Sequence, residues 1–203
     1  IAVIRLSAMG DVAMTVPVLL ALVDQHPEVK ITVVSRPFFK PLFEKIPNVH
    51  YFSVHTHHQH KGILGLFRLY RDLKKLKVDY IADLHNVLRS IVIRKLFALS
   101  GKKVAFTDKG RAEKAALTHL KDKIFQPVKP MIERHIDTFE SLGFRIEMKQ
   151  PYFLEKELIP LKAQQILGVK NRKWLGIAPF AHYESKTYPL DLMKKVIDQL
   201  AKD

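Results

Sequence analysis

Short apolar runs alternate along this chain with longer segments of helical periodicity, and this alternation constrains the fold most. Segments 12–25, 38–45, 63–76 and 88–99 have helical patterns. The intervening apolar, partly β-branched runs predict strands at 1–6, 30–35, 49–54, 80–84 and 103–106. Strands that alternate with helices in this way indicate βαβ units and a mostly parallel sheet. The sequence therefore predicts an α/β fold with a doubly wound, Rossmann-like domain.

A second, smaller region follows this domain. A helix is predicted over 131–142, with Gly143 in the position of a C-cap. Charged residues and prolines between 144 and 160 indicate an inter-domain connection. Beyond it lie a short helix at 163–167, one strand at 174–178 and one helix at 190–201. We therefore expect one domain over 1–150 and only the truncated start of a second Rossmann-like domain over 151–203.

The first residue, the absence of cysteine and the lengths of the apolar runs give expectations about processing and cellular location. The chain begins at Ile1 rather than Met, so we expect at least one residue to precede it. It contains no cysteine, which excludes disulfides and thiolate metal sites. No apolar run approaches the roughly 20 residues that span a bilayer, and the short opening segment is interrupted by Arg5. We expect a cytoplasmic protein.

The positive charge is unevenly distributed. The chain has a net charge of +14, and residues 55–111 alone carry 13 basic and 4 acidic side chains. This asymmetry indicates an anionic partner, which could be nucleic acid, an anionic membrane surface or a phosphorylated substrate. A merely soluble basic face is the simpler alternative.

The turn after the first strand, residues 5–12, holds the first chemically informative side chains. In open α/β sheets, ligands bind at the carboxyl ends of the strands. Gly10 would permit a tight turn or close approach of a substrate. Asp11, just ahead of the predicted helix, is either its N-cap or a carboxylate that accepts a proton from a sugar hydroxyl, and the two roles are compatible. The spacing is not GxGxxG, which disfavours an NAD-dependent oxidoreductase.

Four segments resemble glycosyltransferase family 9, the lipopolysaccharide heptosyltransferase family. The segment IRLSAMGDVAMTVP at 4–17 resembles the amino-terminal signature of that family. DLHNVLRS at 83–90, KGRAE at 109–113 and PFAHYESKTYP at 179–189 resemble three further family segments in the same order. Four matches in order are far more specific than one. Arg134 and His135 also resemble a family segment, although a helix-surface position explains them equally well.

The resemblance implies a GT-B architecture, in which two Rossmann-like domains face each other across a cleft. The amino-terminal domain would receive the acceptor, and the second would hold a nucleotide sugar, typically ADP-heptose. The implied reaction is inverting, metal-independent transfer of a heptose or related sugar to a lipopolysaccharide core acceptor, without a cofactor. The absence of an Asp-x-Asp pair from the sequence agrees with this.

Roles for single residues follow from the same resemblance. Asp11 would be the general base that deprotonates the acceptor hydroxyl. Ser185 and Lys186 would lie on the donor side, where Lys186 stabilises charge on the leaving diphosphate, although a solvated surface lysine is the alternative. Gly10, Arg89 and Arg111 would bind the anionic acceptor. The guanidinium groups of the two arginines suit phosphate and carboxylate groups, because each can donate two parallel hydrogen bonds.

The chain also departs from the family pattern. Phe180 replaces a common glycine, His85 and Asn86 replace Gln-Gly, and Ala181 and His182 stand where hydroxyl side chains are frequent. The later donor-binding segments of the family would fall beyond position 203. We therefore expect the fragment to be inactive alone.

The cluster HTHHQH, from His55 to His60, suggests a metal site, because four imidazoles within six residues can chelate zinc or nickel. It contains no carboxylate and follows a predicted strand as a polar loop. A loop that joins the anionic acceptor surface is the favoured interpretation, so we expect no metal site.

The alternative function is a basic nucleic-acid or anionic-membrane binding module without catalysis. Binding of nucleic acid would require exposed aromatic side chains among the cations. Phe67 and Tyr70 are instead expected in an apolar helical stripe, so no nucleic-acid partner is expected.

The apolar residues of 63–67 beside Lys61, Arg68 and Arg71 could form a basic amphipathic helix that binds a membrane. A core-facing helix is the favoured interpretation, and peripheral contact with the inner face of the inner membrane stays open.

Overall fold

The computed structural model describes residues 1–121, 123–168 and 173–201. The chain divides into two compact units, Ile1–Glu155 and Lys156–Asp203, and each is described by itself. The expected limits of the domains, 1–150 and 151–203, stay a prediction.

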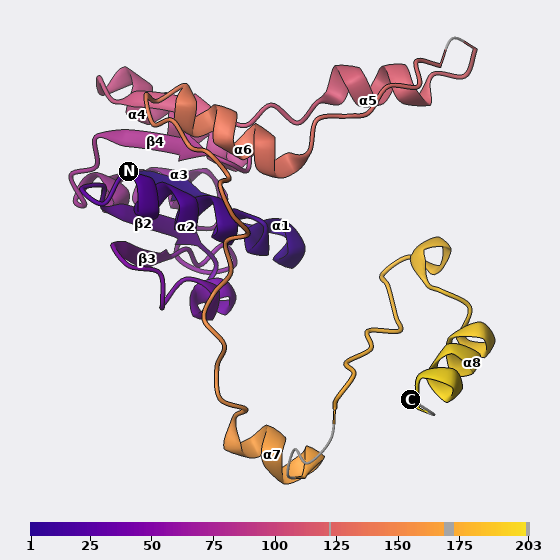
Figure 1. Cartoon of the computed structure of the whole chain (residues 1–203). Coiled ribbons are helices and arrows are strands. Elements are labelled where there is room, and N and C mark those ends of the chain that lie inside the picture. Colours follow the sequence, from indigo (N-terminus) through magenta and orange to yellow (C-terminus); the bar gives the residue numbers. More distant parts are fainter. Residues whose placement is uncertain (122, 169–172, 202–203) are drawn as a thin grey trace. The chain divides into compact units, whose positions relative to one another are not determined.

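Unit 1 is built on a five-stranded parallel sheet (Figure 1). Its strands are β1 (Ala2–Ile4), β2 (Ile31–Ser35), β3 (Val49–Ser53), β4 (Tyr80–Asp83) and β5 (Lys103–Phe106). They are ordered β3-β2-β1-β4-β5, and Val3 in the central strand pairs with Val33 on one side and Ala82 on the other. The chain thus winds outwards from β1 in one direction and then in the other, which confirms the predicted doubly wound topology.

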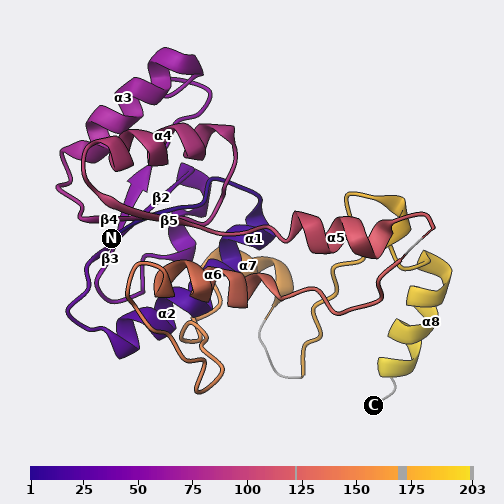
Figure 2. The ribbon, with the colours of Figure 1, turned by 90° about the horizontal axis from the view of Figure 1, so that it is seen from above.

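Helices cover both faces of this sheet (Figure 2). On one face lie α2 (Thr15–Gln25) and α6 (Met131–Glu140), and on the other lie α3 (Gly62–Lys74) and α4 (Leu88–Leu99). The connections include α1 (Met9–Ala13), the 3₁₀ helix η1 (Pro37–Leu42) and α5 (Arg111–Thr118). The helix α5 differs from the prediction, in which its first residues belong to a basic loop.

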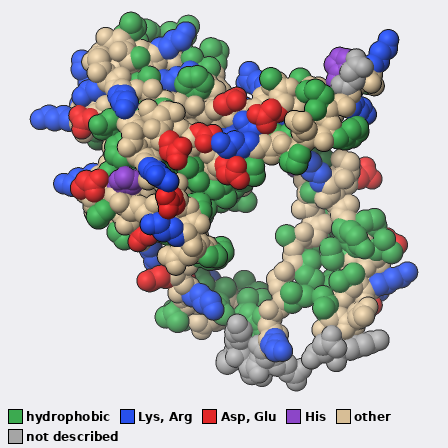
Figure 3. All heavy atoms as spheres, turned by 45° about the horizontal axis from the view of Figure 1, so that its top comes forward, with side chains coloured by type: hydrophobic (Ala, Val, Ile, Leu, Met, Phe, Trp, Pro, Cys, Tyr) green, Lys and Arg blue, Asp and Glu red, His purple; other side chains and the backbone are tan. Residues whose placement is uncertain are grey.

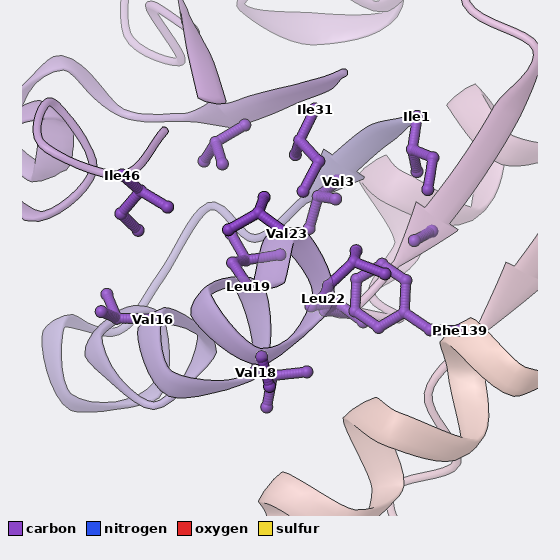
Figure 4. Packing of buried hydrophobic residues seen from close by; sticks show 14 of the residues in the cluster. Ile1, Val3, Val16, Val18, Leu19, Leu22, Val23, Ile31, Ile46 and Phe139 are labelled. Carbon is purple, nitrogen blue, oxygen red and sulfur yellow. The ribbon is translucent and has the colours of Figure 1, made fainter. Parts of the chain in front are cut away.

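Two hydrophobic clusters hold the three layers together. Successive residues of a strand point to opposite faces, so Val3 packs towards α2 and α6 while Ile4 packs towards α3 and α4. Figure 4 shows Leu22 of α2 beside Phe139 of α6 in the first cluster, and both are completely buried. The core therefore fixes β1 from both sides.

Prolines change two of the predicted helices. Instead of one helix over 12–25, the chain forms α1 and α2 with a break at Met14. Pro17 would clash with the carbonyl of Ala13 in a continuous helix, but it is tolerated as the third residue of α2. The helix expected over 38–45 is the shorter η1, a 3₁₀ helix that contains Pro37 and Pro41.

Gly143 ends α6 as predicted. Its φ of +102° is a conformation that favours glycine. Its N–H donates to the carbonyl of Glu140 at 2.8 Å, and the N–H of Phe144 donates to the carbonyl of Phe139 at 3.0 Å. This pair of bonds is a Schellman motif.

Unit 2 contains α7 (Leu161–Leu167), the 3₁₀ helix η2 (Glu184–Lys186) and α8 (Leu190–Leu200). The strand predicted over 174–178 is not formed, and Leu175 within it is 65% exposed. A strand requires a hydrogen-bonded neighbour, and the described residues of unit 2 supply none. Hydrophobic side chains accordingly gather on the surface of unit 2 in Figure 3. Among the described residues, no helix has the length and apolarity to cross a membrane.

Phe139→Ala should destabilise unit 1 strongly, because it opens a cavity between α6 and α2 at a completely buried position. Truncation of a buried Phe costs about 3–5 kcal/mol. Phe125→Ala, at a position that is 82% exposed, is the matched control. Urea unfolding followed by circular dichroism measures both, and equal stabilities would contradict the position of Phe139 in the core.

Candidate active site

A cavity of about 510 Å³ lies where the carboxyl ends of the parallel strands meet. The segments that follow β1, β2, β3 and β4 contribute to it, together with the first turns of α3 and α4. Its lining consists of Leu6, Ser7, Arg36, Thr56, Gly62, Ile63, Leu66, His85, Val87, Leu88 and Arg89. This is the edge at which open α/β sheets bind ligands.

Beside the cavity, a buried arginine holds the carboxylate of Asp11. Arg5 is 5% exposed, and its guanidinium donates to the carbonyl of Leu84 at 2.5 Å. Its other terminal nitrogen, Nη2, lies 2.5 Å from Oδ2 of Asp11, whose side chain is 45% exposed. A buried charge requires a partner, so this ion pair fixes the orientation of the Asp11 carboxylate at the edge of the sheet.

Asp11 is the third residue of α1, so the prediction that it is the N-cap is wrong in position. The N-cap is Ala8, whose backbone N–H donates to Oδ2 of Asp11 at 3.4 Å. Gly10 lies inside the same helix without a positive φ, so the chain does not need glycine there for a turn. A Cβ atom at Gly10 would meet only open space. The roles predicted for Asp11 and Gly10 towards an acceptor stay predictions.

His85 lies between the cavity and this ion pair. Its Nε2 is 3.3 Å from the hydroxyl of Ser7. Burial, together with the positive charges of Arg5 and Lys109, lowers the pKa of His85 to about 4, against the opposite effect of Asp11. The imidazole is therefore neutral at pH 7 and can both donate and accept a hydrogen bond.

The buried carboxylate of Asp83, at the end of β4, shapes the loop that carries His85. Its Oδ1 accepts the backbone N–H groups of His85 at 3.1 Å and Asn86 at 2.8 Å. Burial raises the pKa of this carboxyl, although Arg94 lies 3.4 Å from its Oδ2. Asn86, at φ +45°, donates its side-chain amide to the carbonyl of Thr107. The loop between β4 and α4 is thus tied to β5.

Cations gather around the cavity. Arg89 is the second residue of α4 and lines the cavity, and Arg36 lines it from the end of β2. Burial lowers the pKa of Lys109, and so do the positive charges of Arg5 and Arg111. Positive charges that are close together repel each other. A bound anionic ligand would therefore stabilise this group of cations.

Arg134 and His135 are not on a helix surface, so that interpretation is wrong. Arg134 is 4% exposed and pairs with Glu113 at 2.5 Å. Its Nη2 lies so close to Gly110 that a Cβ atom there would be 2.4 Å away. His135 is fully buried, 3.2 Å from the hydroxyl of Thr107, and burial lowers its pKa to about 4. Both residues thus hold the segment that follows β5, Arg134 through Glu113 and His135 through Thr107.

The histidine cluster is partly a structural element. His60 is fully buried, and its Nδ1 accepts the backbone N–H of His55 at 3.0 Å. Its Nε2 lies 3.7 Å from the carboxylate of Asp72. In the described ranges, no three His, Asp or Glu side chains are grouped so that they could hold a metal ion.

The donor-side candidates lie in unit 2. Ser185 and Lys186 belong to η2, and both are at its surface. The ammonium group of Lys186 lies 5.5 Å from the centre of the Tyr183 ring. The prediction that Lys186 faces Asp11 across a cleft stays a prediction.

Four residues at the site were not identified as candidates from the sequence: Arg36, Thr56, His85 and Lys109. Each lies within three residues after the carboxyl end of a strand. That position in a parallel sheet was the signal that could have found them.

These features define a class of protein: a doubly wound α/β domain with an ion-paired carboxylate and several cations at the ligand-binding edge of its sheet. The model of Glycosyltransferase family 9 (heptosyltransferase) matches residues 66–203. The chain belongs to this family. The matched range does not include Asp11, so the assignment of that residue rests on the amino-terminal motif and on the geometry of the site.

Solved structures show the same fold. A glycosyl transferase family 9 protein from Veillonella parvula DSM 2008 has a TM-score of 0.71 and 20% identity, over 99% of this chain and 59% of the other. E. coli heptosyltransferase WaaC with ADP gives a TM-score of 0.59 at 16% identity, over 98% and 64%. WaaC with ADP-2-deoxy-2-fluoro heptose gives 0.58 at 16% identity, over 98% and 65%.

The predicted α/β, GT-B type fold is thereby confirmed, and the chain spans about 59% of the length of the Veillonella protein. A search of curated proteins finds no match.

Lowering the pH from 7 to 5 should destabilise unit 1, and His135 should account for roughly 2 kcal/mol of that loss. Its pKa is about 4 in the folded protein and about 6.5 when unfolded. Between these values the unfolded chain binds the extra proton, so stability is present above pH 6.5 and decreases towards pH 4. Urea unfolding at pH 7, 6 and 5 measures the slope.

His135→Gln should reduce this slope, whereas the control His50→Gln, at an exposed position, should not. An unchanged slope in His135→Gln would exclude the buried, neutral state of His135.

Proposed function

We propose that the protein is an inverting, metal-independent glycosyltransferase. It moves a heptose or a related sugar from a nucleotide-sugar donor, ADP-heptose, to a lipopolysaccharide core acceptor. The observation that carries this proposal is the half-exposed Asp11 carboxylate, held by the buried Arg5 beside a cationic cavity at the carboxyl edge of the sheet.

Asp11 is the general base in this proposal. Its contacts with Arg5 and with the N–H of Ala8 both use Oδ2. Oδ1 is left to accept the proton of the acceptor hydroxyl while the hydroxyl oxygen attacks the anomeric carbon. Attack opposite the departing diphosphate inverts that carbon. The neutral imidazole of His85 can hold a further acceptor hydroxyl by a hydrogen bond.

The leaving group is a nucleoside diphosphate, which requires its negative charge to be compensated as the bond breaks. We assign this role to Lys186, with Ser185 as a hydrogen-bond donor. The solved structures of WaaC with ADP and with ADP-2-deoxy-2-fluoro heptose support a nucleotide-sugar donor. Because a lysine supplies the positive charge, the proposed reaction needs no metal ion.

The acceptor is an anionic glycolipid in this proposal. Arg36 and Arg89 line the cavity, and Lys109 lies close enough to Arg5 and Arg111 to be affected by their positive charges. Such a cavity suits phosphate or carboxylate groups on a saccharide. We propose that the reaction takes place in the cytoplasm, at the inner face of the inner membrane, and that nucleic acid is not a partner.

We also propose that residues 1–203 alone transfer no sugar. The chain spans about 59% of the Veillonella family member. Its donor-side candidates lie in a unit whose described apolar residues are largely exposed. The activity is therefore to be measured on the longest natural form of the protein.

Asp11→Asn should lower kcat by a factor of about 100 or more, since general-base catalysis contributes 10²–10⁴-fold. Asp79→Asn is the matched control, because Asp79 is exposed and precedes β4 at the opposite edge of the sheet. Transfer from ADP-heptose to a deacylated core acceptor measures both variants. An Asp11→Asn enzyme with unchanged kcat would remove the proposed mechanism.

Arg89→Ala should raise the KM for the acceptor about 10-fold or more, since a hydrogen bond to a charged group contributes about 1.5–3 kcal/mol. The same substitution should have little effect on an acceptor from which the phosphate groups have been removed. Lys95→Ala, on the same helix, is the control. Equal losses with both acceptors would show that Arg89 does not recognise the phosphate groups.

A further inference from the structure

The first two turns of α3 expose apolar side chains. Ile63, Leu64 and Phe67 are 75%, 85% and 53% exposed. The prediction that Phe67 lies in the buried stripe is therefore wrong. The helix does face the core as predicted, but through Leu69 and Leu73, which are buried.

The packing of α3 prevents these side chains from turning inwards. Gly65 lies against the backbone of His60, so closely that a Cβ atom at Gly65 would be 2.3 Å from the carbonyl carbon. Only a glycine permits this approach. Because His60 is itself buried, the contact fixes which side of α3 faces the protein.

The outward side of α3 combines this apolar end with cations. At 100° per residue, Arg68 and Arg71 fall in the same sector as Leu64 and Phe67, and both arginines are exposed. The outer face is therefore apolar over its first turns and basic further along. This distribution suits a helix whose apolar end enters an anionic bilayer while its arginines stay at the lipid headgroups.

The apolar end is continuous with the mouth of the cavity. Ile63 lines the cavity together with Leu88, which is 79% exposed at the start of α4. Two helices from different parts of the chain thus present apolar side chains at the same opening. An isolated exposed Leu would need no explanation, but a group of this kind marks an interaction surface.

We propose that Ile63, Leu64, Phe67 and Leu88 form a docking tip that inserts into an anionic lipid bilayer, with Arg68 and Arg71 on the lipid headgroups. The charge of residues 55–111, with 13 basic and 4 acidic side chains, selects an anionic membrane over a neutral protein surface. The docking does not depend on which sugar is transferred. If the proposed function is correct, docking also brings the cavity mouth to the plane in which a glycolipid acceptor lies.

Sedimentation with vesicles tests the docking tip. The chain should bind vesicles of 30% phosphatidylglycerol in phosphatidylcholine and should bind pure phosphatidylcholine at least 10-fold more weakly. Leu64→Glu/Phe67→Glu should reduce the partition coefficient on anionic vesicles by 10-fold or more, because it places two anions in the apolar tip. Leu99→Glu, 86% exposed at the far end of α4, is the matched control and should bind as the wild type does.

Arg68→Gln and Arg71→Gln should each reduce the partition coefficient about fivefold, which corresponds to about 1 kcal/mol for a cation near an anionic surface. The absence of binding to anionic vesicles, or equal binding by wild type and Leu64→Glu/Phe67→Glu, would overturn the proposal.

Fluorescence distinguishes insertion from simple adsorption. The chain has a single tryptophan, Trp174, so Trp174→Phe provides a silent background. In that background Phe67→Trp should shift its emission to the blue on anionic vesicles, and Leu99→Trp should not. An unshifted emission at position 67 would overturn insertion.

Transfer to a deacylated, soluble acceptor separates this proposal from the proposed function, since neither Leu64 nor Phe67 lines the cavity. In the longest natural form of the protein, Leu64→Glu/Phe67→Glu should retain that transfer while it loses vesicle binding. If that form binds vesicles through the tip but transfers no sugar, the docking proposal is preserved and the proposed function is contradicted.

Discussion

The ion pair between Arg5 and Asp11 is the interaction on which the site depends. A guanidinium buried after the central strand is tolerated only because a backbone carbonyl and a carboxylate compensate it. Leu84 supplies the carbonyl from the end of β4, so the pair also ties the two neighbouring strands together. The same contact that allows Arg5 to be buried places the carboxylate of Asp11 beside the cavity.

The surrounding sheet makes this arrangement rigid. Parallel strands bring their carboxyl ends to one edge, and each end contributes one polar element to the site. Asp83 is buried at that edge and fixes the loop of His85 by two backbone hydrogen bonds. His135 and Arg134 are buried behind it on α6. The segments that carry the exposed cations are therefore held in place, so several of these cations can contact one bound anion.

Much of this could be predicted from the sequence. The five strands and the α4 helix follow from hydrophobic periodicity, because a sheet buried on both faces requires continuous apolar runs. Asp11 and Arg89 were found through short motifs, and the structure places Arg89 at the cavity.

The strand at 174–178 was wrongly predicted, because an apolar run of this kind forms a strand only when a neighbouring strand is present. Phe67 was assigned to the buried stripe although it is exposed, because periodicity alone does not reveal the close contact of Gly65 with His60. Arg36 and Lys109 also follow strand ends, but their positions relative to Asp11 depend on the strand order, which the sequence does not reveal.

The most direct test of the account is an NMR titration of His85 in this chain with a deacylated, phosphorylated core acceptor. The account predicts that the pKa of His85 rises from about 4 when the acceptor binds, because an anion offsets the nearby positive charges of Arg5, Lys109 and Arg36. The NMR signals of the exposed His50 should be the same with and without the acceptor. Acceptor binding that leaves His85 unchanged would place the anionic ligand elsewhere and contradict the assignment of this cavity as the acceptor site.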